Sequence, residues 1–444
     1  MSTSVPRPAS PDEPPRSSIP SGLRDLPFFY GWLIVLVSSM SGFLGAGLNN
    51  VTMGVVLKPM SEDMGWSRTL TAGAITLGTF TGALLIPVLG RITDRIGPRL
   101  LLPGGGALVA ILSMGVSTVQ EPLQFYLMYF PARALASATL IGVLPVTAVA
   151  NWFRQRRARA IGIVNMSLQL GSSLLVILYQ LLIQHFGWRS TFDVLGILII
   201  VLVVVPGFVI LRRSAEDVGM HLDGIDPNTR PHHGRVTGGT RSLVAEEYSW
   251  SLHDAVRTPA LWLVIGTFST AVMAGGGIAF HMVAYYTDLG ISPVMAAAAL
   301  SLYAFCGAMA SGIWGYLAER IPPRQLTAIA FGAATIGILL FAQVRDEWMG
   351  LAVAAYAGLA ARGVLALMHL VLASYFGRRS YGSISGITGL FQQAAGGVGP
   401  LVAAYAFDIT GSYQGILTIF AALYMMATVL ILFSRPPVPR AVNI

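Results

Sequence analysis

Four ionisable residues lie inside long apolar stretches of this chain: Arg133, His281, Arg362 and His369. An ionisable side chain is costly in a bilayer core and usually faces a cavity or a partner there. A buried guanidinium can hold a carboxylate with two parallel hydrogen bonds, and histidine can exchange a proton near neutral pH. We therefore expect Arg362 and Arg133 to bind an anion and His281 and His369 to carry protons. The alternative is structural: each arginine pairs with helix-end carbonyls or a polar neighbour, and each histidine is a packing residue with satisfied hydrogen bonds.

A repeated motif divides the chain into two halves. Residues 90–98 (GRITDRIGP) and 315–323 (GYLAERIPP) share one pattern, and each is followed by an arginine. Such a repeat indicates two copies of one ancestral unit. A duplicated apolar chain is typical of membrane transporters, which hold a substrate between their halves.

The repeated motif also carries charges that suit a gate. Asp94 and Glu319 occupy the same position in the two copies. Carboxylates among arginines can form ion pairs that lock one conformation and break in another. Arginines are expected here for topology alone, but topology does not require a carboxylate in both copies. The residues that we assign to gating are Asp94, Arg95, Arg99, Glu319, Arg320 and Arg324.

Uncharged polar residues recur at helical spacing in one apolar stretch of each half. They are Asn165, Gln169 and Ser172 in the first half and Ser385, Thr388 and Gln392 in the second. Polar residues also hold membrane helices together, which is the alternative interpretation. Because the two stripes occupy corresponding helices, we expect them to line a cavity. The residues that we add to substrate binding are Asn165, Gln169, Thr388 and Gln392.

The composition supports a membrane protein. Hydrophobic residues make up 54% of the 444 residues and charged residues 11%, with a mean hydropathy of +0.67. A soluble chain would carry about a quarter charged residues. The pI near 9.8 does not indicate nucleic-acid binding, because the basic residues are spread over many short gaps between apolar runs. The single cysteine, Cys306, cannot form an internal disulfide.

Soluble-enzyme motifs are missing from the sequence. The only lysine, Lys58, is followed by Pro59, which excludes a Gly-Lys-Ser/Thr phosphate-binding loop. The sequence has no Cys pair and no His-Glu-x-x-His string that would bind a metal. We therefore expect no enzyme activity, no cofactor and no metal.

The apolar runs predict twelve transmembrane helices, six in each half, because a helix needs about 20 apolar residues to cross a bilayer. The expected spans are 29–57, 68–90, 100–119, 122–150, 158–183 and 190–211, and then 260–287, 293–317, 325–343, 348–374, 382–406 and 413–434. The expected organisation is a disordered tail (1–27), a six-helix bundle (28–211), a connector (212–257), a second six-helix bundle (258–434) and a short tail (435–444).

The distribution of Lys and Arg predicts the orientation. If both termini are inside, the inner segments hold twenty-two basic residues and the outer gaps only four: Lys58, Arg68, Arg189 and Arg345. Cytoplasmic loops carry an excess of basic residues, so both tails and the connector are expected in the cytoplasm. The protein would then lie in the plasma or inner membrane of the cell.

These residues also carry a family resemblance. The string GRITDRIGPR after the second span is similar to the signature loop of the major facilitator superfamily, and its second copy lies where that family repeats it. Several other strings resemble the monocarboxylate-transporter branch and its bacterial relatives. They are Tyr30-Gly31-Trp32, Leu57-Lys58-Pro59-Met60, Gly65-Trp66-Ser67-Arg68, the string from Asn151-Trp152-Phe153-Arg154 to Gly162, HMVAYYTDLG at 281–290 and DITGSY at 408–413.

The chain departs from that branch in its charged residues. Animal members place a lysine within the first span and an Asp and Arg pair in the eighth. Here the matching part of span 1 is Asn49-Asn50-Val51, Lys58 lies at the outer end of that span, and span 8 has no charged residue. Drug antiporters of the superfamily often carry a Gly-Pro motif in span 5, whereas residues 162–184 contain no proline.

The resemblance implies an all-α membrane protein with two pseudo-symmetric six-helix bundles, the major facilitator fold. It implies a secondary transporter of a small organic anion, in particular a monocarboxylate, working by alternating access and coupled to protons. The expected partners are therefore the substrate anion, protons and the lipid bilayer. Two alternatives stay open: an exporter of amphipathic drug-like compounds, and a membrane sensor that does not transport.

Overall fold

The computed structural model describes residues 28–153, 156–215, 218, 220, 221, 223, 250–318, 320–361, 364–377 and 381–437. Over these residues the chain is helical throughout, with no β-strand. The expected N-terminal tail and most of the expected connector lie outside the described residues.

The helices of the first half coincide with the first six expected spans. They are α1 (Gly31–Gly45), η2 (Ala46–Leu48) and α2 (Asn50–Met64) in the first span, α3 (Arg68–Ile96), α4 (Pro98–Ser117), α5 (Pro122–Ala136) with η3 (Ser137–Gly142) and α6 (Val143–Ala150), α7 (Arg157–Phe186), and α8 (Arg189–Ile199) with η4 (Ile200–Val204) and α9 (Val205–Ile210).

The second half repeats this arrangement after a short helix, α10 (Leu252–Ala255). Its helices are α11 (Pro259–Asp288), α12 (Pro293–Leu317), α13 (Pro323–Phe341), α14 (Glu347–Ala361), α15 (Val364–Phe376), α16 (Tyr381–Thr410) and α17 (Gln414–Phe433). Together α14 and α15 correspond to the tenth expected span.

Within the described part of the chain, ten helices are long and apolar enough to cross a membrane. The tenth and eleventh expected spans are not among them. α14 and α15 are shorter helices on either side of residues 362 and 363, which are not described. α16 has 30 residues, but its glycines and the pair Gln392 and Gln393 lower its mean hydropathy.

Local sequence sets where these helices begin and end. Proline occupies the first helical position of five helices, where its missing N–H has no intrahelical partner to lose. These are Pro98, Pro122, Pro259, Pro293 and Pro323. At the other ends, glycines at positive φ terminate α2 and α16, with φ of 65° at Gly65 and 66° at Gly411.

The first and fourth spans are interrupted near the middle of the bundle. Asn49 has an extended backbone, and its side chain caps α2 by accepting a hydrogen bond from Thr52 N at 3.1 Å. In the fourth span, the π-helical turn η3 begins directly after α5. Discontinuous membrane helices expose polar backbone where they line a cavity, and π-helical turns are frequent at functional sites.

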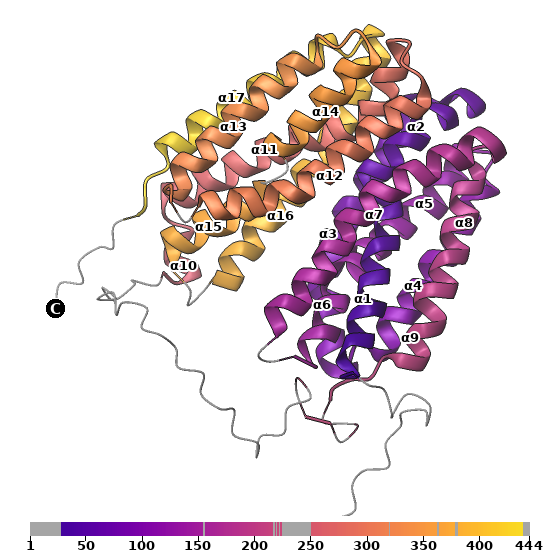
Figure 1. Cartoon of the computed structure of the whole chain (residues 1–444), viewed down its shortest axis with the longest axis vertical. Coiled ribbons are helices and arrows are strands. Elements are labelled where there is room, and N and C mark those ends of the chain that lie inside the picture. The colour runs from indigo at the N-terminus through magenta and orange to yellow at the C-terminus, as the bar shows by residue number, and fades with distance from the viewer. Residues whose placement is uncertain are drawn as a thin grey trace, which may run out of the picture.

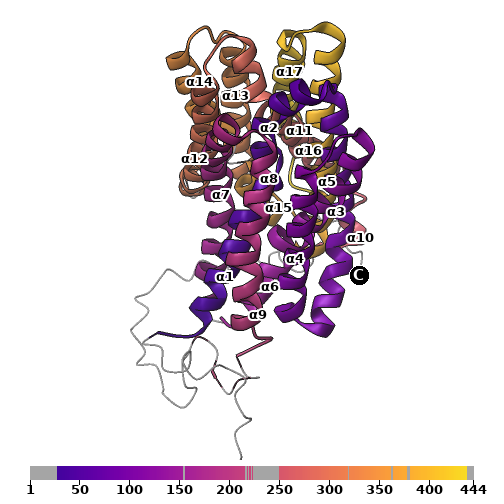
Figure 2. The ribbon, with the colours of Figure 1, turned by 90° about the vertical axis from the view of Figure 1, so that its right-hand side faces the viewer.

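The two halves lie side by side and contact one another mainly through three helix pairs: α2 with α11, α3 with α16, and α7 with α12 (Figures 1 and 2). Exchanging the two halves maps the first pair onto itself and the second onto the third. The interface therefore follows the internal repeat that the sequence predicts.

Close contacts hold the halves together. A side chain at Gly54 would place its Cβ 2.3 Å from the carbonyl oxygen of Phe280, so only glycine allows α2 to approach α11 this closely. Between α7 and α12, Ser173 Oγ donates to Ser301 O at 3.0 Å, and Ser301 Oγ donates to Ser173 O at 2.9 Å.

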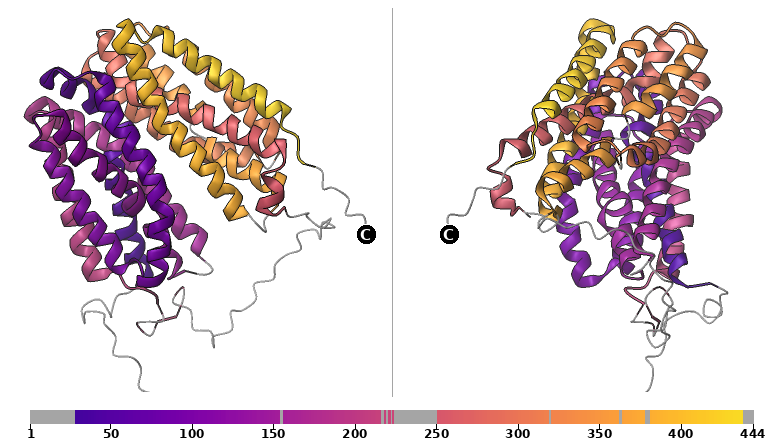
Figure 3. Two further views of the ribbon diagram at one scale, coloured as in Figure 1. Left: turned by 180° about the vertical axis from the view of Figure 1, so that it is seen from behind. Right: turned by 60° about the vertical axis from the view of Figure 1, so that its left-hand side comes forward.

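The halves converge at one end of the molecule and diverge at the other (Figures 1 and 3). The converging end contains the turn from α2 to α3 and the turn from α16 to α17, and we call it the closed end. The diverging end contains α9 and α10, and we call it the connector end. Large apolar side chains such as Leu84, Leu108 and Ile111 are more than half exposed on the bundle, as expected for helices that face lipid.

Candidate functional site

A cavity of about 220 Å³ lies between the two halves, and we call it the central cavity. The first half contributes residues from α2, α3, α5 and α7, and the second half from α11, α12, α14, α16 and α17. The lining residues are Asn50, Val51, Thr79, Arg133 and Gln169, and then Ala271, Val272, Gly275, Gly276, Ala279, Tyr303, Ala361, Gln393, Gly396 and Tyr424.

Arg133 is the cationic side chain among these lining residues. Its side chain is buried, and its Nη1 donates a hydrogen bond of 2.7 Å to Ser137 Oγ, one turn further along. Its Nε is buried and has no hydrogen-bond partner within the described part of the chain. A buried donor without an acceptor is costly, more so when it is charged. The arrangement therefore leaves a guanidinium beside the cavity with one of its donors unpaired.

A glycine on the neighbouring helix makes room for this arginine. A Cβ at Gly78 of α3 would lie 2.7 Å from both Cβ and Cγ of Arg133. The stem of Arg133 is thus pressed against the α3 backbone. This contact fixes the depth at which the guanidinium enters the bundle.

Amide side chains from both halves surround the cavity. Asn50 donates from Nδ2 to Gly396 O at 3.1 Å, and its Oδ1 is buried without a partner among the described residues. Gln169 and Gln393 also line the cavity. Amides can both donate and accept hydrogen bonds, so they suit the carbonyl or hydroxyl groups of a small substrate.

The predicted polar stripes are only partly brought to this cavity. Gln169 lines it, whereas Asn165 is exposed and is not among the lining residues. Thr388 is buried and donates to Ile384 O at 3.0 Å, and Gln392 is buried with Nε2 2.7 Å from Met368 Sδ. Both bond within their own half, and Gln393 rather than Gln392 reaches the cavity. Substrate binding by these residues stays a prediction.

The two stripe serines also differ in placement. Ser172 is buried, where its Oγ accepts a hydrogen bond of 2.8 Å from Asn49 Nδ2. Ser172 therefore holds the interrupted first span against α7. Ser385, in the second half, is half-buried and makes a contact of its own.

The other intramembrane candidates are scattered. Arg362 lies outside the described residues, although its neighbour Ala361 lines the central cavity. His369 is exposed on α15 and has an interaction partner. His281 is buried on α11 and lies toward the closed end rather than at the central cavity.

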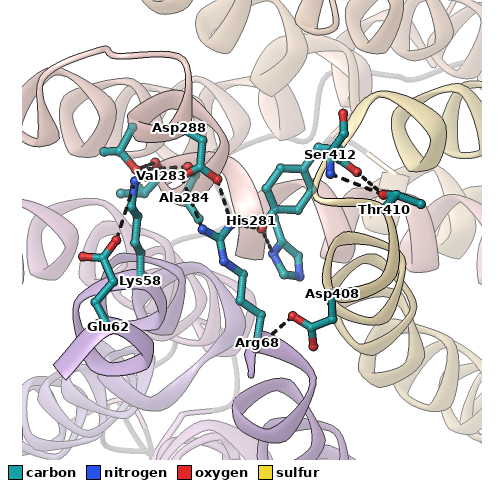
Figure 4. Close-up of polar contacts among 12 residues, drawn as sticks. Lys58, Glu62, Arg68, His281, Val283, Ala284, Asp288, Asp408, Thr410 and Ser412 are labelled. Atoms are coloured by element: carbon teal, nitrogen blue, oxygen red, sulfur yellow. Dashed lines mark hydrogen bonds and ion pairs between the residues drawn. The ribbon is translucent and has the colours of Figure 1, made fainter. Parts of the chain in front are cut away.

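The closed end is held by a cluster of charges that joins the two halves (Figure 4). We call Lys58, Arg68, Asp288, Asp408 and Tyr413 the gate cluster. Asp288 Oδ1 lies 2.7 Å from Lys58 Nζ, and Asp288 Oδ2 lies 2.9 Å from Arg68 Nη1. Arg68 Nη1 also donates to the hydroxyl of Tyr413. In this cluster the first half supplies the cations, and the second half supplies the carboxylates.

Asp408 caps a helix of the opposite half. Its Oδ1 accepts from Arg68 N at 3.3 Å and its Oδ2 from Thr69 N at 2.9 Å, at the first turn of α3. A helix N-terminus has unpaired N–H groups and a partial positive charge, so a carboxylate is stabilising there. The guanidinium of Arg68 also lies over the ring of Phe407, with Cζ 3.8 Å from the centroid.

His281 connects to the gate cluster through a hydrogen-bond chain. Its Nε2 lies 2.9 Å from Pro400 O, and its Nδ1 lies 2.8 Å from the hydroxyl of Tyr413. Tyr413 precedes α17, and burial raises the pKa of its hydroxyl, so the phenol stays neutral. Both imidazole nitrogens therefore have partners. Nδ1 is linked to Arg68 through the hydroxyl of Tyr413.

Among the predicted inner-gate residues whose side chains the structure describes, no ion pair forms at the connector end. Arg95 and Arg99 are exposed, Arg320 donates to Tyr316 OH at 2.6 Å, and Arg324 donates to Leu432 O. The backbone of Asp94 lies in α3, but its side chain and Glu319 lie outside what the structure describes. All four ion pairs among the described residues lie at the closed end. Because the halves diverge at the connector end, the gating role of the repeated motif stays a prediction for the opposite state.

Sequence reasoning missed the gate cluster, although its parts were visible as strings. Each residue of the gate cluster comes from one of four strings that the sequence analysis named: 57–60, 65–68, 281–290 and 408–413. His281 comes from the third of these strings. Each string lies at the end of an expected span, where charged residues are common and do not by themselves indicate a functional site. Their convergence was the missing information.

The remaining strings meet at the connector end of the first half. The ring centroids of Tyr30 and Trp152 are 5.2 Å apart, and those of Trp32 and Phe153 are 5.1 Å apart. Tyr30 OH donates to Ile210 O at 2.7 Å. These strings therefore join the start of α1 to the ends of α6 and α9.

Comparisons with known proteins agree with this architecture. The family model described as Major Facilitator Superfamily matches residues 31–298 and 263–444. The chain belongs to this superfamily, and it is a multi-pass membrane transporter rather than an enzyme.

Individual relatives differ in the substrates that their names give. The chain is 26% identical over 395 residues to "Probable nitrate/nitrite transporter NarK2" of Mycobacterium tuberculosis, covering 85% of this chain and 90% of the relative. It is 24% identical over 400 residues to "Monocarboxylate transporter 11" of Homo sapiens, covering 86% and 78%. A solved bacterial homologue of the human lysosomal transporter Spinster has the same fold, with a TM-score of 0.65 at 14% identity over 91% of this chain and 93% of that one.

Proposed function

We propose that this chain moves a small organic anion, in particular a monocarboxylate, across the membrane by alternating access driven by protons. One observation carries the proposal: Arg133 lies buried beside the central cavity with an Nε that has no acceptor in the described chain. A carboxylate could take both Nε and an Nη of this guanidinium in the usual bidentate geometry.

The walls of the cavity favour an organic anion over an inorganic one. Val51, Val272, Ala271 and the ring of Tyr424 line the cavity together with Arg133. An apolar wall stabilises a carbon skeleton, which nitrate lacks. The relatives named for nitrate and for monocarboxylates both carry anions, so both agree with a cationic site.

The size of the cavity favours a small substrate. Drug-sized ligands occupy pockets of about 300–1,000 Å³. The central cavity measures about 220 Å³, below that range. A short carboxylic acid therefore fits it better than an amphipathic drug, which supports anion transport over the drug-exporter alternative.

We assign the closed end to the outside of the cell and the connector end to the cytoplasm. The excess of basic residues in the segments at the connector end supports this orientation. The structure then corresponds to a carrier that is closed to the outside. The proposed location is the plasma or inner membrane.

Transport into proteoliposomes tests the function directly. Labelled lactate, pyruvate, formate and nitrate, and an amphipathic cationic dye, should be offered with and without an inward proton gradient. We expect uptake of the monocarboxylates, accelerated by the gradient, and no comparable uptake of nitrate or dye. Preferential transport of nitrate or of the dye would overturn the substrate assignment, and binding of lactate without uptake would favour the sensor.

A further inference from the structure

We propose that protonation of His281 opens the closed end by reversing its hydrogen bond with Tyr413, whose hydroxyl oxygen already accepts from Arg68. The inference rests on the proposed function, because it names the group through which protons act on the carrier. It concerns the closed end of the molecule and not the central cavity.

The direction of the hydrogen-bond chain follows from its terminal acceptor. The carbonyl of Pro400 can only accept, so Nε2 of His281 carries a hydrogen and donates it over 2.9 Å. A neutral imidazole has one N–H, so Nδ1 must be an acceptor, and it takes the hydroxyl proton of Tyr413 over 2.8 Å. The oxygen of Tyr413 then accepts from Nη1 of Arg68. Each group is satisfied, with His281 neutral.

A second proton on His281 breaks this order. Nδ1 becomes a donor, so the Tyr413 oxygen faces donors from both His281 and Arg68, and its own hydrogen loses its acceptor. Two cations then meet at one oxygen in a buried site, where their repulsion is poorly screened. His281 is only 3% exposed, so water cannot relieve the conflict without movement.

The neighbouring carboxylates do not offset the positive charge of protonated His281 while the closed end stays closed. Asp288, on the same helix as His281, is already shared between Lys58 and Arg68. Asp408 of α16 is bound to the first turn of α3. Tyr285 of α11, the remaining titratable group beside His281, lines the same small apolar pocket and cannot take up a positive charge.

Separation of the halves removes the conflict. Arg68 and Lys58 belong to the first half, whereas His281, Asp288 and Asp408 belong to the second. Opening the closed end carries both cations away and leaves protonated His281 with two carboxylates in its own half. The open state therefore binds the proton more tightly than the closed state does.

Linkage gives the direction of the effect. Because binding and conformation are coupled reciprocally, low pH favours opening at this end, and opening favours proton uptake. In a carrier facing an acidic exterior, the proton would hold the outer entrance open until an anion offsets its charge. This order of events couples the anion to the proton.

The test measures conformation and needs no substrate. In a Cys306→Ser background, spin labels at Gln120→Cys in the first half and Arg345→Cys in the second report the opening of the closed end. On purified protein, the ratio of open to closed populations should rise by about tenfold from about pH 8 to about pH 5, within the usual range of coupling between sites. His281→Gln, which cannot be protonated, should abolish this response.

Two further variants make the test specific. Tyr413→Phe keeps the ring but removes the hydroxyl that links His281 to Arg68, so it should also abolish the pH response. This variant keeps the test possible if His281→Gln fails to fold. His185→Gln, at an exposed histidine near the end of α7, is the matched control and should retain the response. A wild-type pH response in either His281→Gln or Tyr413→Phe would overturn the inference.

The outcome is separable from that of the proposed function. Loss of the pH response in His281→Gln, together with an absence of anion uptake by the wild type, would support the gate and overturn the substrate. Proton-driven anion uptake together with an unchanged pH response in His281→Gln would support the function and overturn this inference.

Discussion

At the scale of single residues, Arg133 shows how an expensive charge is tolerated in a membrane bundle. Nη1 is satisfied by Ser137, while Nε is buried without an acceptor in the described chain. An unpaired charged donor costs stability, but Arg324, away from the cavity, also leaves its Nε unpaired among the described residues. The place of Arg133 at the central cavity is therefore what points to a ligand. The half-satisfied guanidinium therefore fits a site that a ligand completes.

Replacing Arg133 with lysine tests this interpretation. Lysine keeps the charge but loses the planar fork, so affinity for the anion should fall by about tenfold to a hundredfold, the equivalent of one lost charge-assisted hydrogen bond. KM for uptake by the purified variant in proteoliposomes measures the effect. Arg189, which is half-buried and pairs with Asp63 at the protein's closed end, provides the control: Arg189→Lys should leave KM unchanged. A near-normal KM in Arg133→Lys would leave Arg362 as the next candidate.

At the scale of elements, the closed end depends on helix ends that meet across the interface. The N-terminus of α3 is capped from α16 by Asp408, and the C-terminus of α11 supplies Asp288 to both cations of the first half. In the alternating access that we propose, these contacts are lost when the halves separate at the closed end. They stabilise one conformation rather than the fold of either half.

Removing these carboxylates should shift the carrier toward the open state. Asp288→Asn ends two ion pairs. Asp408→Asn removes the negative charge at the N-terminus of α3, an interaction typically worth about 0.3–1 kcal/mol. The label pair at positions 120 and 345 should show a larger open population in both variants, with thermal stability nearly unchanged. Asp346→Asn is the control, because Asp346 caps Met349 N within its own half. An unchanged distance distribution in Asp288→Asn would remove the gate cluster from conformational control.

At the scale of the whole molecule, three helix pairs connect two bundles related by the repeat. Glycines and serines lie at these contacts, as at Gly54, Ser173 and Ser301. Small residues allow membrane helices to pack closely and to slide or rock without large rearrangement. The interface therefore agrees with the rocking of two halves about the central cavity that we propose.

The orientation of the whole molecule can be measured in cells. In a Cys306→Ser background, a cysteine at Ser214 beyond α9 should resist an impermeant thiol reagent added outside, because we assign that end to the cytoplasm. A cysteine at Gln120, between α4 and α5, should react. Labelling of Ser214→Cys with protection of Gln120→Cys would reverse the assignment.

The sequence by itself determined the membrane class, the positions of most spans, the repeat and the superfamily. These are local properties: a run of apolar residues must span a bilayer wherever it lies, and basic loops bias orientation without reference to packing. It also identified the buried charges, because an ionisable residue in an apolar run is conspicuous. Arg133 was found in this way.

Only the tertiary structure decided which polar groups meet. Gln392 and Gln393 are adjacent, yet one packs within its half and the other lines the cavity, since successive helical residues point in different directions. Arg68 meets Asp288 and Tyr413 across 220 and 345 positions of sequence, and no local pattern encodes such a contact. The gate cluster and its link to His281 arise from the packing of two halves whose separate sequences do not specify how their ends will face each other.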